Sequence, residues 1–79
     1  MNKYMEELKE LRPFDTIEAI KPVGLGYNFI RTSQHGYLVV PKEDLFFSKA
    51  RKICNYGCKG KLACYLEEDC EYPAFRRLF

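Results

Sequence analysis

The sequence lacks most of the patterns on which familiar enzyme sites are built. It contains a single histidine, His35, and has neither a glycine-rich phosphate-binding loop nor a Gly-x-Ser-x-Gly motif. The stretch Gly24-Leu25-Gly26 is too short to be a nucleotide-binding fingerprint. These absences argue against nucleotide-dependent enzymes and serine hydrolases, and they leave His35 as the only histidine for acid–base chemistry.

Long apolar runs, repeats, low-complexity segments and linkers are also missing. No run reaches the roughly 18 apolar residues that a membrane-spanning helix needs, and residues 1–12 lack the apolar centre of a signal peptide. The length of 79 residues predicts a single small domain over residues 1–79. We therefore expect a cytoplasmic protein with no membrane partner.

The charge is small in total but uneven along the chain. A net charge of +2 does not by itself require a nucleic-acid partner. Residues 67–71 hold four acids and no base, whereas residues 49–61 hold five bases and no acid, namely Lys49, Arg51, Lys52, Lys59 and Lys61. The simplest interpretation is two solvated faces of opposite sign.

The first half of the chain predicts one helix and three strands. Residues 2–12 form a helix because apolar residues recur at spacings of three and four, with Asn2 as the N-cap and Pro13 beyond the end; the stripe is Met1, Tyr4 or Met5, Leu8 and Leu11. Strands at residues 15–23, 27–32 and 37–40 are separated by glycine-containing turns and make an antiparallel meander. The third strand is apolar on both faces, so it should be central.

The second half adds helix, strand and a final helical turn. Pro41 should open a helix that ends near Asn55-Tyr56-Gly57, since proline suits the first turn and glycine the position after the last. Residues 62–66 are predicted as a fourth strand, and residues 73–79 as a last turn of helix. The predicted class is α+β: a three- or four-stranded antiparallel sheet with helices packed on one face.

Four carboxylates surround Cys70 and form a candidate site, namely Glu67, Glu68, Asp69 and Glu71. Paired carboxylates can transfer protons or bind a divalent cation. If the strands at 37–40 and 62–66 are neighbours, His35 reaches one of these acids and could act as a base, as in a small hydrolase or nuclease. The structural alternative is that His35 and Gly36 tie a turn together and that an acid caps the following helix.

The four cysteines follow the spacing C-x3-C-x5-C-x5-C at Cys54, Cys58, Cys64 and Cys70. Four thiols could hold zinc, although only the first two have the spacing of common zinc sites. In an extended segment Cys64 and Cys70 would lie roughly 20 Å apart, so a shared metal would require a bend. Disulfides and buried free thiols are the alternatives.

The basic residues of 49–61 are interleaved with tyrosines. Lysines and arginines could follow a phosphate backbone while Tyr56 and Tyr65 stack on bases. Such binding would depend strongly on salt. This pattern gives the second functional hypothesis, a zinc-stabilised module that binds nucleic acid.

Two segments resemble a known family. The sequence from Thr32 to Pro41, TSQHGYLVVP, and the sequence from Leu66 to Cys70, LEEDC, resemble a small domain of unknown function found in phage, plasmid and other mobile-element proteins. The likeness covers roughly residues 27–75, and this chain departs from it at Gln34 and in its three additional cysteines. The resemblance implies a genomic setting rather than a chemistry.

These observations favour a non-enzymatic accessory protein without a cofactor. Its expected partner is a host protein complex, and inhibition of host defence is the expected outcome. Either the acids at 67–71 mimic phosphate toward an arginine-rich partner, or Lys49, Arg51 and Lys52 dock on an acidic surface. His35, Gly36 and Cys70 are expected to have structural roles in the turns next to the acidic residues.

Overall fold

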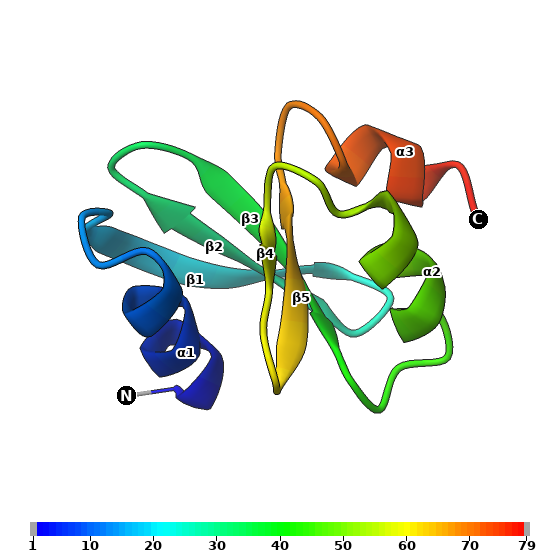
Figure 1. Cartoon of the computed structure of the whole chain (residues 1–79), viewed down its shortest axis with the longest axis horizontal. Helices are drawn as coiled ribbons and strands as arrows, with labels where there is room; N and C mark the ends of the chain where they lie inside the picture. The colour runs from blue at the N-terminus through cyan, green and yellow to red at the C-terminus, as the bar shows by residue number, and fades with distance from the viewer. Residues whose placement is uncertain (1, 79) are drawn as a thin grey trace.

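A computed structural model describes residues 2–78 as a twisted five-stranded sheet with three helices (Figure 1). All neighbouring strands are antiparallel, in the order β1-β2-β3-β5-β4. In chain order the elements are α1 (Lys3–Leu11), β1 (Ile17–Gly24), β2 (Tyr27–Thr32), β3 (Gly36–Pro41), α2 (Phe47–Ile53), β4 (Cys58–Lys59), β5 (Ala63–Glu67) and α3 (Tyr72–Arg76). The α+β class is confirmed. Within residues 2–78, none of the helices has the length and apolar character needed to cross a membrane.

The first helix follows its sequence signals. The side chain of Asn2 accepts a hydrogen bond from the Tyr4 N–H at 2.7 Å, and α1 ends just before Pro13. Leu8 is fully buried, whereas Leu11 remains 42% exposed. The predicted stripe therefore faces the sheet through its middle; Met1 lies outside the described residues.

The meander of β1, β2 and β3 is confirmed, and β3 is central as predicted. It lies between β2 and β5, and Tyr37, Leu38, Val39 and Val40 are all buried. Because side chains alternate along a strand, Leu38 and Val40 face one layer while Tyr37 and Val39 face the other. A strand this apolar on both sides requires cover on both sides.

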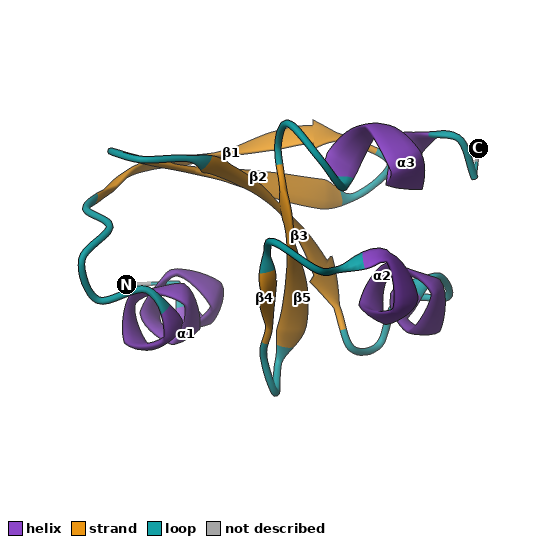
Figure 2. Ribbon diagram, turned by 45° about the horizontal axis from the view of Figure 1, so that its top comes forward, coloured by secondary structure: helices purple, strands orange, loops and turns teal. Residues whose placement is uncertain are grey.

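The sheet accordingly separates two cores, so the prediction of helices on one face is wrong. Helix α1 covers one face through Tyr4, Met5 and Leu8, while α2 and α3 cover the other (Figure 2). The α1 core contains Leu8, Ile30, Tyr37, Val39, Cys58, Ala63 and Tyr65. The opposite core contains Tyr27, Leu38, Val40, Ala50, Cys54, Cys64, Leu66 and Phe75.

The number of strands also exceeds the prediction of three or four. The strand expected at residues 62–66 is β5, and it pairs with β3. The additional strand, β4, has two residues, Cys58 and Lys59, that pair with Tyr65 and Cys64. A segment of two residues carries no alternation by which a sequence pattern could identify it.

Strand β1 contains a bulge that interrupts the alternation of its side chains between the two faces of the sheet. Its register with β2 shifts between Ile17 and Ala19, so that Glu18 is the extra residue of a bulge. The shift brings Ile17 and Ile20, which regular alternation would place on opposite faces, against the same α1 core.

The second and third helices differ from their predicted starts. Pro41 is the last residue of β3 and pairs with Ala63, and α2 begins only at Phe47. The Asp44 carboxylate accepts hydrogen bonds from the Phe46 N–H at 2.9 Å and the Tyr27 hydroxyl at 2.8 Å. This local turn replaces the first turn expected after Pro41. Helix α3 starts at Tyr72, and Phe79 lies outside the described residues.

Candidate functional site: the acidic turn beside His35

The candidate site forms where β3 begins and β5 ends. Antiparallel pairing places Tyr37 opposite Glu67, and the Glu68 N–H donates to the Gly36 carbonyl at 2.9 Å. The turn before β3 and the turn of residues 68–70 therefore lie side by side. The condition on which His35 could reach one of the acids, that the third and fourth predicted strands are neighbours, is met by the pairing of β3 with β5.

The turn that carries His35 is held by Thr32. The Thr32 hydroxyl donates to the His35 carbonyl at 2.7 Å and accepts from the His35 N–H at 2.9 Å. The imidazole is about half exposed, with Nδ1 3.7 Å from Glu67 Oε1, and its ring meets that of Tyr37 edge to face at 6.2 Å. His35 thus has a fixed backbone and a ring that faces both a carboxylate and solvent.

Gly36 is required at this position by close packing. A Cβ atom there would lie 2.2 Å from the Phe29 ring and 2.9 Å from a Glu68 carboxylate oxygen. Any side chain would push the Phe29 ring or the Glu68 carboxylate away from the start of β3. The predicted structural role of Gly36 in the turn therefore has a direct steric basis.

Glu67 is buried and belongs to the structure of the turn. Its Oε1 accepts a hydrogen bond from the Asp69 N–H at 3.1 Å. Burial alone would raise the pKa of Glu67, but hydrogen bonds from the Asp69 N–H and the Cys70 thiol, together with the charge of His35, lower it below its usual value. Glu67 is therefore an ionised group that stabilises the turn from within.

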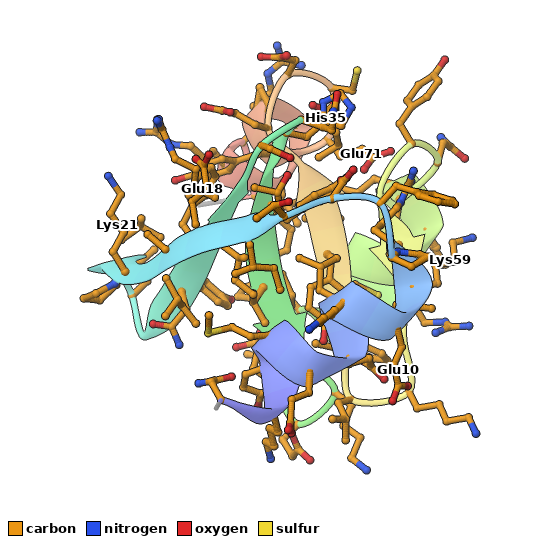
Figure 3. All side chains as sticks on the ribbon, turned by 90° about the vertical axis from the view of Figure 1, so that its left-hand side faces the viewer. Glu10, Glu18, Lys21, His35, Lys59 and Glu71 are labelled. Atoms are coloured by element: carbon orange, nitrogen blue, oxygen red, sulfur yellow. The ribbon has the colours of Figure 1, made fainter. Side chains whose placement is uncertain are left out.

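Glu71 is the most extensively bonded carboxylate described. It is 3% exposed. Its Oε2 accepts from the N–H groups of Asn55 and Tyr56, and its Oε1 accepts from those of Gly57 and Glu67 at 2.9 and 3.0 Å. It thereby fastens the loop after α2 to the end of β5. Figure 3 shows Glu71 and His35 toward the same end of the molecule.

The predicted acid surface is therefore divided by the fold. Glu67 and Glu71 are buried and bonded to backbone N–H groups, so their prediction as partner contacts is wrong. Glu68 and Asp69 are exposed. Only these two acids of the cluster can meet a partner without breaking the turn.

An open cavity of about 260 Å³ adjoins Glu68. Its walls include Glu18 from β1, Arg31 from β2, His35 and Glu68. Glu18 and Arg31 were not predicted as site residues, because they are distant along the chain from the acid cluster and approach it only through strand pairing. The cavity carries both signs of charge, which suits a polar protein surface better than an apolar ligand.

Three of the five cations of the basic segment lie on α2. Lys49, Arg51 and Lys52 are exposed on α2, and the Arg51 guanidinium lies 5.9 Å from the centre of the Phe47 ring. Tyr56 is exposed, but Tyr65 is fully buried and its hydroxyl donates to Glu7 at 2.7 Å. The predicted stacking of Tyr65 on bases is therefore wrong, because that ring belongs to the core.

The four cysteines do not converge. Cys54 and Cys64 belong to the core under α2 and α3, Cys58 belongs to the α1 core, and Cys70 is exposed. All four are free thiols, and residues 2–78 contain no group of three or more His, Cys, Asp or Glu side chains placed to hold a metal ion. The four thiols whose spacing suggested a zinc site are instead divided between the two cores and the surface.

Sequence reasoning missed two polar anchors of α1. The Glu7 carboxylate accepts from the N–H groups of Lys61 and Leu62 and from the Tyr65 hydroxyl. Glu7 sits on the apolar stripe of the helix, beside Leu8, and a carboxylate on that stripe was the signal available. Arg12 donates to the Tyr56 carbonyl at 2.8 Å and to the Cys58 sulfur at 3.0 Å. No feature of the sequence around Arg12 indicated these contacts.

No protein-family model, curated protein or solved structure matches this chain.

Proposed function

We propose that this chain is a non-enzymatic accessory protein of a phage or other mobile element that acts in the host cytoplasm by binding a host protein complex. Inhibition of host defence is the consequence that this setting favours. The observation that carries the proposal is the construction of the acidic turn. Two buried carboxylates, Glu67 and Glu71, fix the backbone from which Glu68 and Asp69 project into solvent.

A turn fixed in this way is suited to binding. Because the backbone is already ordered, little conformational entropy is lost when the exposed acids meet a partner. Carboxylates pair most strongly with arginine, whose two parallel N–H groups match two carboxylate oxygens. The partner surface is therefore proposed to be arginine-rich, such as one that otherwise binds phosphate.

The likeness to mobile-element domains supports the setting of this proposal. The two segments that carry the likeness meet at one place, where the Glu68 N–H donates to the Gly36 carbonyl and His35 faces Glu67.

The test is recovery of partners from a host lysate by tagged protein. Glu68→Gln combined with Asp69→Asn should reduce recovery of the main partner at least about tenfold, the effect of losing about 1.4 kcal/mol of binding free energy. The matched control is Glu6→Gln combined with Glu10→Gln, which removes the same charge from exposed positions of α1. Equal recovery by both double variants would remove the acidic turn from the interface.

One observation favours a catalytic alternative, the 3.7 Å approach of His35 to Glu67 beside an open cavity. A histidine oriented by a carboxylate can act as a base in a small hydrolase or nuclease. Against this weighs the commitment of Glu67 to the Asp69 N–H. His35→Ala distinguishes the two functions: it should abolish any hydrolysis of nucleic acid or ester substrates, whereas partner recovery should depend on Glu68 and Asp69.

A further inference from the structure

The tip of the β1–β2 hairpin has an unusual residue in its turn. Gly24 pairs with Tyr27, so the loop consists of Leu25 and Gly26 alone. Both loop residues have positive φ, 54° at Leu25 and 80° at Gly26. Two-residue hairpin loops with positive φ at both positions strongly favour Asn-Gly, Asp-Gly or Gly-Gly.

Leucine is unfavourable at the first position of this turn. In the left-handed region its Cβ atom crowds the following carbonyl oxygen, a strain that glycine avoids and that asparagine offsets through local hydrogen bonds of its side chain. The side chain is also 75% exposed, so burial within the chain does little to offset that strain. A strained backbone at an exposed apolar residue indicates a role outside the stability of the fold.

A groove lies between this tip and the last helix. It has a volume of about 460 Å³, and its described walls are Val23, Leu25, Tyr72 and Arg76. The ring of Tyr72 lies 6.1 Å from that of Phe29, which fixes this wall against the sheet. Val23 is 38% exposed. Arg76 is the one charged side chain among the described walls, so the groove places two aliphatic side chains, Val23 and Leu25, beside a single cation.

We propose that this groove docks a segment of a partner protein in which an apolar side chain lies close to a carboxylate. Leu25 and Val23 contact the apolar side chain, and the Arg76 guanidinium pairs with the carboxylate. The choice of partner rests on charge complementarity, because the one guanidinium of the groove lies beside two aliphatic side chains and so matches a segment with one acid next to one apolar residue. A membrane surface would instead be bound by a broader apolar face with several cations.

This groove is distinct from the acidic turn. It uses α3 and the hairpin tip, whereas Glu68 and Asp69 lie between β5 and α3. The two surfaces prefer opposite charges, so either one can fail its test while the other passes.

The experiment selects random 12-residue displayed peptides on the immobilised wild-type protein and depletes them on the Leu25→Asn variant. The expected peptides carry an apolar residue within three positions of Asp or Glu. They should bind Leu25→Asn and Arg76→Ala at least about tenfold more weakly than wild type. The matched control is Phe14→Asn, which makes the same kind of change at a side chain that is 94% exposed in the loop after α1; its affinity should equal that of wild type.

Two further measurements separate binding from folding. Leu25→Asn should raise the urea midpoint, because asparagine tolerates the turn better than leucine, so that lost binding cannot come from unfolding. Arg76→Glu should shift the selected peptides toward Lys and Arg. The proposal is overturned if no peptide is enriched, if the enriched peptides lack an acid, if Leu25→Asn binds them as wild type does, or if anionic lipid vesicles bind in place of peptides.

Discussion

Replacing Glu71 tests the claim that a buried carboxylate holds the candidate site together. The substitution Glu71→Gln keeps the size of the side chain but replaces one oxygen by an NH2 group. Each Glu71 oxygen accepts from two backbone N–H groups. In either orientation of the amide, two of the four N–H donors therefore face a donor instead of an acceptor.

The expected loss follows from those two donors. A hydrogen bond to a charged group contributes about 1.5–3 kcal/mol, and a buried donor left without an acceptor costs about 1–3 kcal/mol. Because part of the loop can recover bonds to water, we expect Glu71→Gln to lower the free energy of unfolding by roughly 3 kcal/mol. A domain of this length has a total stability of roughly 4–12 kcal/mol, so Glu71→Ala, which removes all four bonds, should leave it barely folded.

The assay is urea unfolding followed by far-ultraviolet circular dichroism, since the chain has no tryptophan. The matched control is Glu68→Gln, an exposed acid in the same turn, which should change the free energy of unfolding by less than about 0.5 kcal/mol. A loss of under about 1 kcal/mol for Glu71→Gln, or equal losses for both variants, would refute the assignment of Glu71 as the anchor of this turn.

Three further predictions test other polar and thiol groups. Glu7→Gln should lower the urea midpoint, because its carboxylate joins α1 to Leu62 and Tyr65, and an unchanged midpoint would show that Glu7 does not anchor α1. Burial raises the pKa of Glu67, but its hydrogen bonds and the charge of His35 outweigh burial and lower it. The stabilisation by Glu67 is therefore present above its unfolded-state pKa and is lost as the pH falls through its lowered folded-state pKa. The difference in unfolding free energy between wild type and Glu67→Gln, measured from about pH 7 to about pH 3, should shrink as the pH falls. A difference that stays constant would contradict this prediction. An aromatic disulfide reagent should modify exposed Cys70 in the native protein, although its hydrogen bond to Glu67 raises the pKa of the thiol and slows the reaction. Cys54, whose pKa burial raises to about 12, should react only on unfolding. Modification of the native protein that persists in Cys70→Ser would contradict this assignment.

Local elements of the fold were predictable because their signals lie within a few residues. The strand predicted at residues 27–32 is β2, Tyr27–Thr32, since glycine and polar residues bound an aromatic and β-branched run. The first helix was predictable from its cap and its apolar spacing. Pro41 misled because proline also suits the end of a strand, and the following Asp44 forms its own turn before α2.

The candidate site was predictable only in part. That His35 meets an acid followed from the pairing of two neighbouring strands. Which acid remains exposed did not follow, because the donors that bury Glu71 come from Asn55, Tyr56 and Gly57, 14 to 16 residues earlier in the chain.

The sequence by itself determined the α+β class, the central apolar strand and the placement of four acids next to one another, because each depends on composition or spacing over a short stretch. Only the tertiary structure decided that two helical layers enclose the sheet and that Glu67 and Glu71 are buried while Glu68 and Asp69 are exposed. The physical reason is that a carboxylate can be buried only where backbone N–H groups converge on it, and that convergence requires distant segments to be folded together.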